Sequence, residues 1–195
     1  MNTHIDISDV ELKTDRLLLR PWREDDVDDF FAYASVDGVG QMAGWAPHKT
    51  KAESAAILSR FIQGKKTFAV VYGAKVIGSV GIEKYDEAKS PEFQHLQGRA
   101  LGAVLAKAYW GQGLMPEALN EVIRYLFEDI GLDFVVAGHF PENLRSARLQ
   151  EKCGLVPYKE IPYTTQMGTE TTSIISILWN PSKKGEGAAN SLIRS

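Results

Sequence analysis

The stretch from residue 102 to residue 130, GAVLAKAYWGQGLMPEALNEVIRYLFEDI, constrains the fold more than any other part of the chain. It opens with an apolar run that predicts a buried strand, and Gly111 and Gly113 then interrupt it. Apolar residues next recur at the spacing of one helical face: Leu119, Val122, Ile123, Leu126, Phe127 and Ile130. Pro116 fits the first turn of this helix, where the N–H that proline lacks would have no helical partner. The stretch therefore predicts a strand, a glycine turn and a helix buried on one face.

A glycine turn that leads into a helix N-terminus has the properties of an anion site. It exposes backbone N–H groups beside the positive end of the helix dipole, and phosphate is the usual ligand of such sites. The same glycines also fit a tight turn that binds nothing.

Composition limits the class of protein. The 195 residues with 44% apolar side chains predict one globular domain over residues 1–180, and a polar tail over 181–195 that begins at Pro181. The net charge of −3 argues against nucleic-acid binding, which usually needs a basic face. No signal core or membrane-spanning stretch is visible, and the single cysteine, Cys153, fits a reducing cytoplasm. The histidines, among them His48 and His139, lack ligand spacing, so we expect no metal site.

The order of the predicted elements indicates a mixed α/β fold. Strands are expected at about 17–19, 67–72, 75–85, 99–106, 133–139, 155–163 and 171–179, and helices at 27–34, 51–62, 116–130 and 143–152. In the second helix we expect Ala55, Leu58, Phe61 and Ile62 to face inward. Consecutive strands favour antiparallel pairing, and the strand–helix–strand unit over 99–139 favours one parallel pair. The sheet should therefore be mostly antiparallel, with helices on both faces.

Two common phosphate-binding motifs do not fit the glycine turn. The chain has no GxxxxGK[ST] sequence. The dinucleotide fingerprint GxGxxG would need a third glycine where Pro116 stands, and its acidic residue should end the next strand, whereas Asp133 begins it.

A third motif fits better. Trp110 to Ala118 (WGQGLMPEA), preceded by LGAVL at 101–105, resembles the acetyl-coenzyme A motif of the GNAT acetyltransferases. Within that family it is most similar to the RimJ/RimL branch, which acetylates protein N-termini and related amines. Two other segments resemble the same family: LKTDRLLLRPW at 12–22, and PENLRSA at 141–147 followed by EKCGL at 151–155. The resemblance covers about residues 10–180.

The resemblance implies the GNAT fold, in which the fourth predicted strand (99–106) splays from the fifth (133–139). It implies acetyl-CoA as the cofactor, with the pantetheine arm in this opening, paired with backbone groups of Ala103, Val104 and Leu105. The pyrophosphate would lie on the backbone amides of Gly111, Gln112, Gly113, Leu114 and Met115. Met115 is larger than the residue usual at its position, and Ala103 replaces a usual tyrosine.

The implied reaction is attack of an amine on a thioester. It needs a neutral amine, a donor for the developing oxyanion, for which a backbone N–H near Val104 is a candidate, and a proton for the leaving thiolate. Many family members supply that proton from a tyrosine where this chain has Gln150. In RimL-like relatives a serine serves, and Ser146 matches it, although it also fits a first-turn residue bonded to backbone. Asn143 fits either a pantetheine contact or a helix N-cap.

The general base and the acceptor site are less well defined. Many relatives carry a glutamate where this chain has Ala100, which leaves Glu83 as a candidate base by strand alternation, or a solvated strand residue. His139 is a candidate proton relay, or a packed histidine at a strand end. Trp45, His48, Tyr85 and His139 are the candidates for the acceptor site. We expect Cys153 to be buried and not a nucleophile.

The predicted function is transfer of acetyl from acetyl-CoA to a primary amine, on a protein N-terminus or a small molecule, by direct attack in a ternary complex. A small-molecule acetyltransferase acting on polyamines or aminoglycosides is an alternative. A non-catalytic acyl-CoA-binding protein of the same fold is another. We expect no nucleic-acid or membrane partner, and a homodimer is compatible with the sequence.

Overall fold

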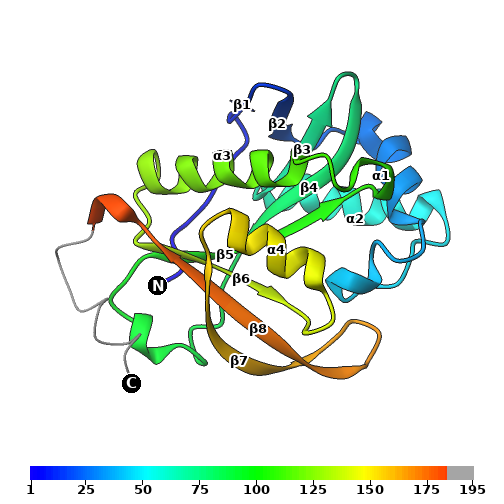
Figure 1. Cartoon of the computed structure of the whole chain (residues 1–195). Helices are drawn as coiled ribbons and strands as arrows, with labels where there is room; N and C mark the ends of the chain where they lie inside the picture. The colour runs from blue at the N-terminus through cyan, green and yellow to red at the C-terminus, as the bar shows by residue number, and fades with distance from the viewer. Residues whose placement is uncertain (184–195) are drawn as a thin grey trace.

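The computed structural model describes residues 1–183, which form one eight-stranded sheet with the order β1-β2-β3-β4-β5-β6-β8-β7 (Figure 1). The strands are β1 (Leu12–Lys13), β2 (Leu17–Pro21), β3 (Thr67–Tyr72), β4 (Lys75–Glu83), β5 (Gly98–Leu105), β6 (Phe134–His139), β7 (Val156–Thr164) and β8 (Glu170–Trp179). The helices are α1 (Val27–Ala34), α2 (Lys51–Gly64), α3 (Leu114–Glu128) and α4 (Leu144–Lys152). Of the expected tail, Pro181–Lys183 form a 3-10 turn and residues 184–195 lie outside the described residues.

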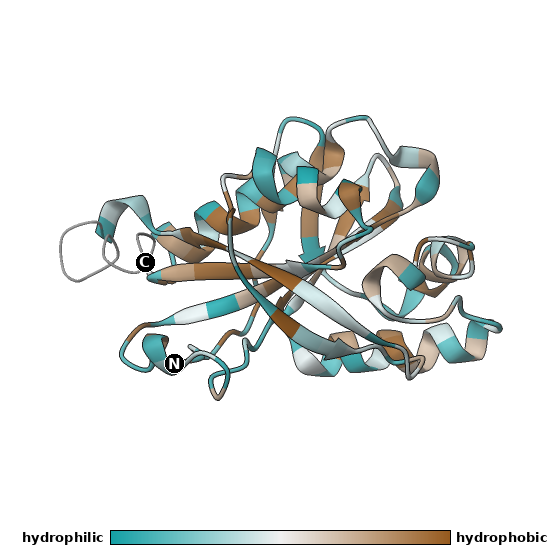
Figure 2. Ribbon diagram, turned by 60° about the horizontal axis from the view of Figure 1, so that its bottom comes forward, coloured by the Kyte–Doolittle hydropathy of each residue, from teal (hydrophilic) through white to brown (hydrophobic). Residues whose placement is uncertain are grey.

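The expected fold class is confirmed: the sheet is mixed and mostly antiparallel, and helices cover both of its faces. Alternation along β3 explains the two layers, because Phe68 and Val70 join the core beneath α3, whereas Ala69 and Val71 join the core beneath α1 and α2. Figure 2 shows this arrangement as apolar central strands between helices whose outer faces are polar.

The inward face of α2 is as expected at Leu58, Phe61 and Ile62, and differs at Ala55. Ala55 is exposed, whereas Ser54 and Leu58 are buried. The polar residue turns inward because its hydroxyl pairs with Nδ1 of the buried His48 at 2.7 Å. Counting apolar residues on the helix therefore placed Ala55 inward, where the polar Ser54 is buried instead.

The opening that the family resemblance implied lies between β5 and β6. These parallel strands pair from Gly98 with Phe134 as far as Leu101 with Ala137, and the pairing ends there. Beyond this point β5 continues only against β4, and Gly138 and His139 pair only with β8. The sheet is thus splayed at its centre, as predicted.

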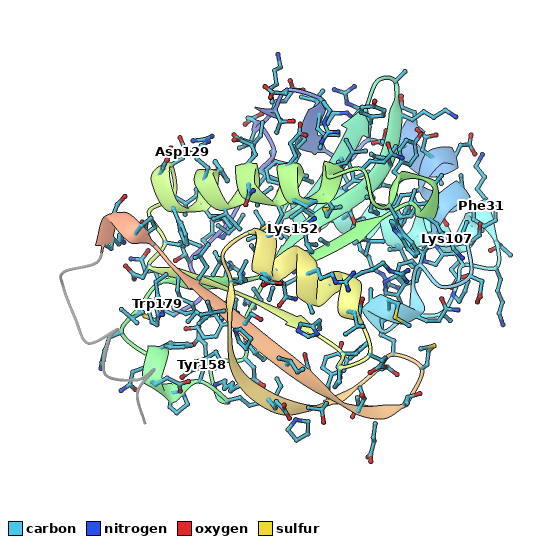
Figure 3. The ribbon with its side chains drawn as sticks, in the orientation of Figure 1. Phe31, Lys107, Asp129, Lys152, Tyr158 and Trp179 are labelled. Atoms are coloured by element: carbon cyan, nitrogen blue, oxygen red, sulfur yellow. The ribbon has the colours of Figure 1, made fainter. Side chains whose placement is uncertain are left out.

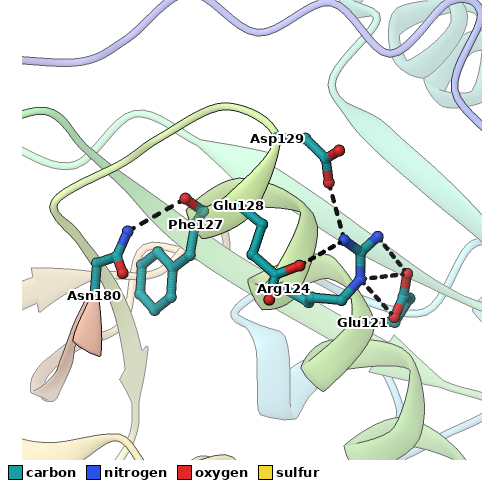
Figure 4. Close-up of polar contacts among 6 residues, drawn as sticks. All are labelled: Glu121, Arg124, Phe127, Glu128, Asp129 and Asn180. Carbon is teal, nitrogen blue, oxygen red and sulfur yellow. Dashed lines mark hydrogen bonds and ion pairs between the residues drawn. The ribbon is translucent and has the colours of Figure 1, made fainter. Parts of the chain in front are cut away.

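The last turn of α3 is fixed by polar contacts on two sides (Figure 4). Arg124 lies among Glu121, Glu128 and Asp129, with nitrogen–oxygen distances of 2.8 to 3.1 Å. The buried Asn180, at the end of β8, donates its side-chain amide to the carbonyl oxygens of Phe127 at 3.2 Å and Leu132 at 2.8 Å. The Arg124 contacts lie within the helix end itself, whereas the Asn180 bonds tie the end of α3 to the end of β8.

The two edges of the sheet are both poor templates for another strand. At one edge β1 has only two residues. At the other, β7 carries Pro157 and Pro162, and proline has no N–H to donate. Within residues 1–183, no helix is both long enough and apolar enough to cross a membrane.

Candidate functional site

An open cavity of about 480 Å³ lies where β5 and β6 separate. One wall comes from the end of β5, the following turn and the start of α3. The other comes from the end of β6 and from α4, and the loop before α2 contributes Val39, Met42 and Ala43. In Figure 3, the cavity-lining Lys152 marks the end of α4, and Lys107 follows the end of β5. Segments far apart in the sequence therefore form one site.

The glycine turn presents an uncapped helix N-terminus to this cavity. Gly111 and Gly113 have φ angles of 77° and 74°, a left-handed conformation that glycine adopts without strain. Gly113 is the N-cap residue of α3, and no side chain caps the helix there. The N–H groups of Leu114 and Met115 lie in the first turn, where no helical carbonyl precedes them. These amides and the helix dipole could therefore bind an anion.

A brace from the N-terminal part of the chain holds this turn. Glu117, in the first turn of α3, accepts hydrogen bonds from the Arg16 backbone at 3.0 Å, from Arg16 Nε at 2.7 Å and from the Thr14 hydroxyl. Arg16 Nη1 also donates to the carbonyl of Gln112 at 3.0 Å. Partial burial acts to raise the pKa of the Glu117 carboxyl, but the hydrogen bonds from Thr14 and Arg16 outweigh it and lower that pKa. Sequence reasoning missed this role, although both residues lie within the segments that resembled the family.

A second contact joins the two walls of the cavity. Trp110 donates its indole N–H to the carbonyl of Leu105 at 2.8 Å. The guanidinium of Arg145, on α4, lies 3.9 Å from the centre of the same indole ring. Arg145, Arg148 and Lys152 make this wall basic, and no acidic side chain lines the cavity among residues 1–183. No local signal in the sequence predicts this contact, because its partners are 35 positions apart.

Backbone direction on β5 determines which peptide groups face the opening. The carbonyl oxygen of Val104 lies against Gly78 of β4, where it is 2.3 Å from the position of a Cβ at that glycine. The carbonyl of Leu105 points away from β4, to Trp110. Because a residue's N–H and C=O point the same way in an antiparallel strand, the peptide groups of Ala103 and Leu105 face the opening and those of Val104 do not.

The start of α4 is closely hydrogen-bonded. Asn143 is its N-cap, as one of the two interpretations predicted, and accepts from the backbone N–H of Ser146 at 3.1 Å. Its side-chain NH₂ donates to the carbonyl of Met42 at 3.0 Å, which ties the helix to the loop before α2. Ser146 Oγ in turn accepts a hydrogen bond from Gln150 Nε2 at 3.3 Å. Asn143, Ser146 and Gln150 all line the cavity.

Comparison with known proteins decides the family. Residues 16–156 match the family model described as an acetyltransferase (GNAT) domain, which is most of the chain. The chain belongs to the GNAT acetyltransferase family. It is 29% identical over 176 residues to the N-acetyltransferase YoaA of Bacillus subtilis, itself described as uncharacterized, a match that covers 86% of this chain and 96% of YoaA. GNAT acetyltransferases use acetyl-CoA, and this chain is an acetyl-CoA-dependent N-acetyltransferase.

Solved structures show the same GNAT fold. The ribosomal-protein-S5-alanine acetyltransferase of Vibrio fischeri superimposes with a TM-score of 0.66 at 21% identity, over 89% of this chain and 98% of that one. The microcin C7 self-immunity acetyltransferase MccE, solved with acetyl-CoA and AMP, superimposes with a TM-score of 0.71 at 15% identity, over 85% of this chain and 93% of that one. The first is a ribosomal-protein acetyltransferase of the kind that the RimJ/RimL resemblance predicted.

Two of the predicted site residues lie outside the GNAT cavity. Glu83 is exposed and forms an ion pair with Lys66, because β4 pairs Glu83 with Ala100, before the opening begins. Tyr85 is buried against Phe93 and Phe134, and its hydroxyl accepts from the Met1 amino group at 2.8 Å. The structure therefore does not bring Glu83 or Tyr85 to the proposed reaction site.

The remaining acceptor-site candidates lie near the GNAT cavity without lining it. The ring of Trp45 packs 5.1 Å from that of His48. His48 is buried, and this burial lowers its pKa, opposed by the nearby Glu53. His139 is also buried, and its Nδ1 lies 2.9 Å from the Phe140 carbonyl oxygen, an acceptor that suits the tautomer with its proton on Nδ1. Of these residues, His139 directly follows the cavity-lining Gly138 in β6.

Proposed function

We propose that the protein acetylates a primary amine by direct attack on acetyl-CoA within a ternary complex. The observation that carries this proposal is the meeting of three features in one cavity: the free edge of β5, the uncapped N-terminus of α3 and the basic side chains of α4. Together these features match the three parts of coenzyme A, which are a peptide-like arm, a pyrophosphate and a further phosphate.

The residues present fit coenzyme A. The Ala103 carbonyl and the Leu105 N–H would pair with the pantetheine amides, and Val104 would contribute its side chain. The amides of Gly111, Gln112, Gly113, Leu114 and Met115 would hold the pyrophosphate, helped by Arg145 and Arg148. When bound, acetyl-CoA supplies the activated acetyl thioester.

The chain's own groups then have distinct tasks. The N–H of Ala103 also faces the opening, further along β5 from the pyrophosphate site than Leu105, and would stabilise the developing oxyanion. The Ser146 hydroxyl lies in the cavity and would protonate the leaving thiolate. His139 is better placed than Glu83 to carry the amine proton toward solvent, since it follows Gly138 of the cavity wall.

The cavity favours an acceptor with a single amine. Its lining has basic side chains and no acidic one among residues 1–183, so it offers nothing to pair with the several ammonium groups of a polyamine or aminoglycoside. The loop before α2 contributes the apolar side chains of Val39 and Met42. A peptide N-terminus, as in the ribosomal-protein acetyltransferase of similar fold, suits these walls better.

The test is release of coenzyme A thiol from acetyl-CoA with a panel of amines. The panel contains peptides that begin with alanine or serine, spermidine and tobramycin. We expect turnover with the peptides and none with spermidine or tobramycin. Faster turnover with spermidine would assign the protein to small-molecule acetylation. Tight binding of acetyl-CoA without turnover on any amine would contradict the catalytic proposal and indicate a non-catalytic binding protein.

A further inference from the structure

Gln150 lines the cavity and has no role in the reaction as proposed above. Its side chain is only 3% exposed, although it is polar and belongs to the last turns of α4. Gln150 and Ser146 are four residues apart, so their side chains lie on one face of the helix. The amide Nε2 donates to Ser146 Oγ at 3.3 Å.

The other end of this amide has no partner. Four buried side-chain polar atoms among the described residues lack a hydrogen bond: Trp22 Nε1, Tyr33 Oη, Trp179 Nε1 and Gln150 Oε1. Gln150 is the one of these residues that lines the cavity. A buried carbonyl oxygen without a donor is unfavourable, and native proteins usually satisfy it with protein, water or ligand. A ligand in the cavity that carries an N–H could supply the missing bond.

We propose that Gln150 is a positioning residue: its NH₂ orients the Ser146 hydroxyl, and its carbonyl oxygen accepts an N–H of the bound pantetheine arm. The inference rests on the proposed function. The ligand bond fixes which end of the amide faces Ser146. With Nε2 donating to Oγ, the serine's own proton is free to point into the cavity. Gln150 thus takes part where many family members have a tyrosine, without acting as the acid itself.

The proton balance is complete with these groups. The amine nitrogen forms a bond to the thioester carbon, and the carbon–sulfur bond breaks with its electron pair on sulfur. Ser146 gives its hydroxyl proton to that sulfur, and the Gln150 N–H stabilises the charge that develops on Oγ. The proton that the amine loses returns to Ser146 through solvent, so no other reactant is needed.

The test uses the product, coenzyme A, and needs no turnover. Binding is measured by calorimetry, and the pKa of the bound thiol is followed through the ultraviolet absorbance of the thiolate as pH rises. The variants are Gln150→Met, which keeps the length of the side chain, Ser146→Ala and the double variant. Glu151→Gln, an exposed neighbour on the same helix, is the matched control.

We expect Gln150→Met to weaken coenzyme A binding about fivefold to tenfold, the loss of about one hydrogen bond. Ser146→Ala should change affinity less than about twofold, because the only part of coenzyme A that Ser146 is proposed to contact is the thiol. Each single variant should raise the pKa of the bound thiol by about half a unit or more, and the double variant should add nothing beyond Ser146→Ala, since Gln150 acts through that residue. Glu151→Gln should behave like the wild type.

Two results would overturn the inference while the proposed function stands. One is a Gln150→Met protein with wild-type affinity and wild-type thiol pKa. The other is a double variant whose effects on the thiol pKa are the sum of the single ones. A wild-type protein that bound no coenzyme A at all would instead contradict the proposed function, and this inference with it.

Discussion

Single residues join the two walls of the cavity, and Trp110 is the clearest case. Its indole N–H holds the carbonyl at the end of β5, and its ring face carries the guanidinium of Arg145 from α4. An aromatic ring with a planar cation on its face is favourable by about 0.5–1 kcal/mol at exposed sites. The contact therefore orders Arg145, which we propose to bind a phosphate of coenzyme A, before any ligand arrives.

Replacing Arg145 should therefore weaken cofactor binding. We expect Arg145→Ala to raise the dissociation constant of coenzyme A about tenfold, through loss of a charge-assisted hydrogen bond worth about 1.5 kcal/mol. The dissociation constant of Arg145→Lys should lie between those of Arg145→Ala and the wild type, because lysine keeps the charge but has no planar group to stack. Calorimetry measures the effect, and Arg60→Ala, on the exposed side of α2, is the control. Equal affinities for the Arg145→Ala and Arg60→Ala proteins would contradict this role.

Cys153 provides a pH-dependent test at the same scale. Burial raises the pKa of its thiol to about 11, and the thiolate is the form that reacts. At pH 8 about a thousandth of the thiol is then ionised, against about a quarter for a free cysteine. The native protein should therefore react with an aromatic disulfide reagent at least about a hundredfold more slowly than the unfolded protein, with a rate that increases up to about pH 11. Equal rates at pH 8 would show that the thiol is accessible.

At the level of elements, the glycine turn and the first turn of α3 act together. Gly113→Glu should abolish binding of acetyl-CoA, because it places a carboxylate at a left-handed residue whose neighbouring amides would hold the pyrophosphate. The same substitution at Gly64, at the end of α2, introduces equal charge far from the cavity and should leave binding unchanged. Calorimetry again provides the readout. Unchanged affinity in the Gly113→Glu protein would place the cofactor elsewhere.

The brace at Glu117 should affect both stability and binding. Glu117→Gln removes the ion pair with Arg16. We expect the free energy of unfolding to fall by about 1–2 kcal/mol and the affinity for coenzyme A to weaken. Because hydrogen bonds lower the pKa of Glu117 in the folded state, its contribution is present above the unfolded pKa, near 4.3, and is lost as pH falls through the folded value. Urea unfolding at pH 7 and at pH 3 measures this. The difference in free energy of unfolding between the wild type and Glu117→Gln should be smaller at pH 3 than at pH 7. An equal difference at the two pH values would exclude an ionised Glu117.

The opposite end of α3 depends on Asn180. Asn180→Ala leaves the carbonyl oxygens of Phe127 and Leu132 without their donor, in a buried position. We expect the free energy of unfolding to fall by about 2 kcal/mol, which for a chain of this size lowers the melting temperature by about 4–8 °C. Thermal unfolding followed by circular dichroism measures it. Ser182→Ala removes only an exposed hydroxyl nearby and should have the melting temperature of the wild type. A similar fall in melting temperature for Asn180→Ala and Ser182→Ala would assign the effect to the terminal turn as a whole.

At the scale of the whole molecule, what the sequence could predict follows from how local each signal is. Periodicity and turn residues placed the helices and most strands, and Asn143 was correctly predicted as a cap because the N-cap signal is local. The position of Glu83 depends on where β4 pairs with β5, and that of Tyr85 depends on its packing against Phe134. Strand alternation alone predicts neither. The Arg145–Trp110 contact likewise forms only when two distant segments meet.

The edges of the sheet have a consequence for assembly. Two copies of a chain can join by continuing one sheet into the next, which requires a long strand with free N–H groups at the boundary. Here one boundary is two residues long and the other carries Pro157 and Pro162. Within residues 1–183, a homodimer contact would therefore involve helices or loops rather than a shared sheet. The folded protein should also resist the strand-by-strand addition of further copies that leads to fibrils.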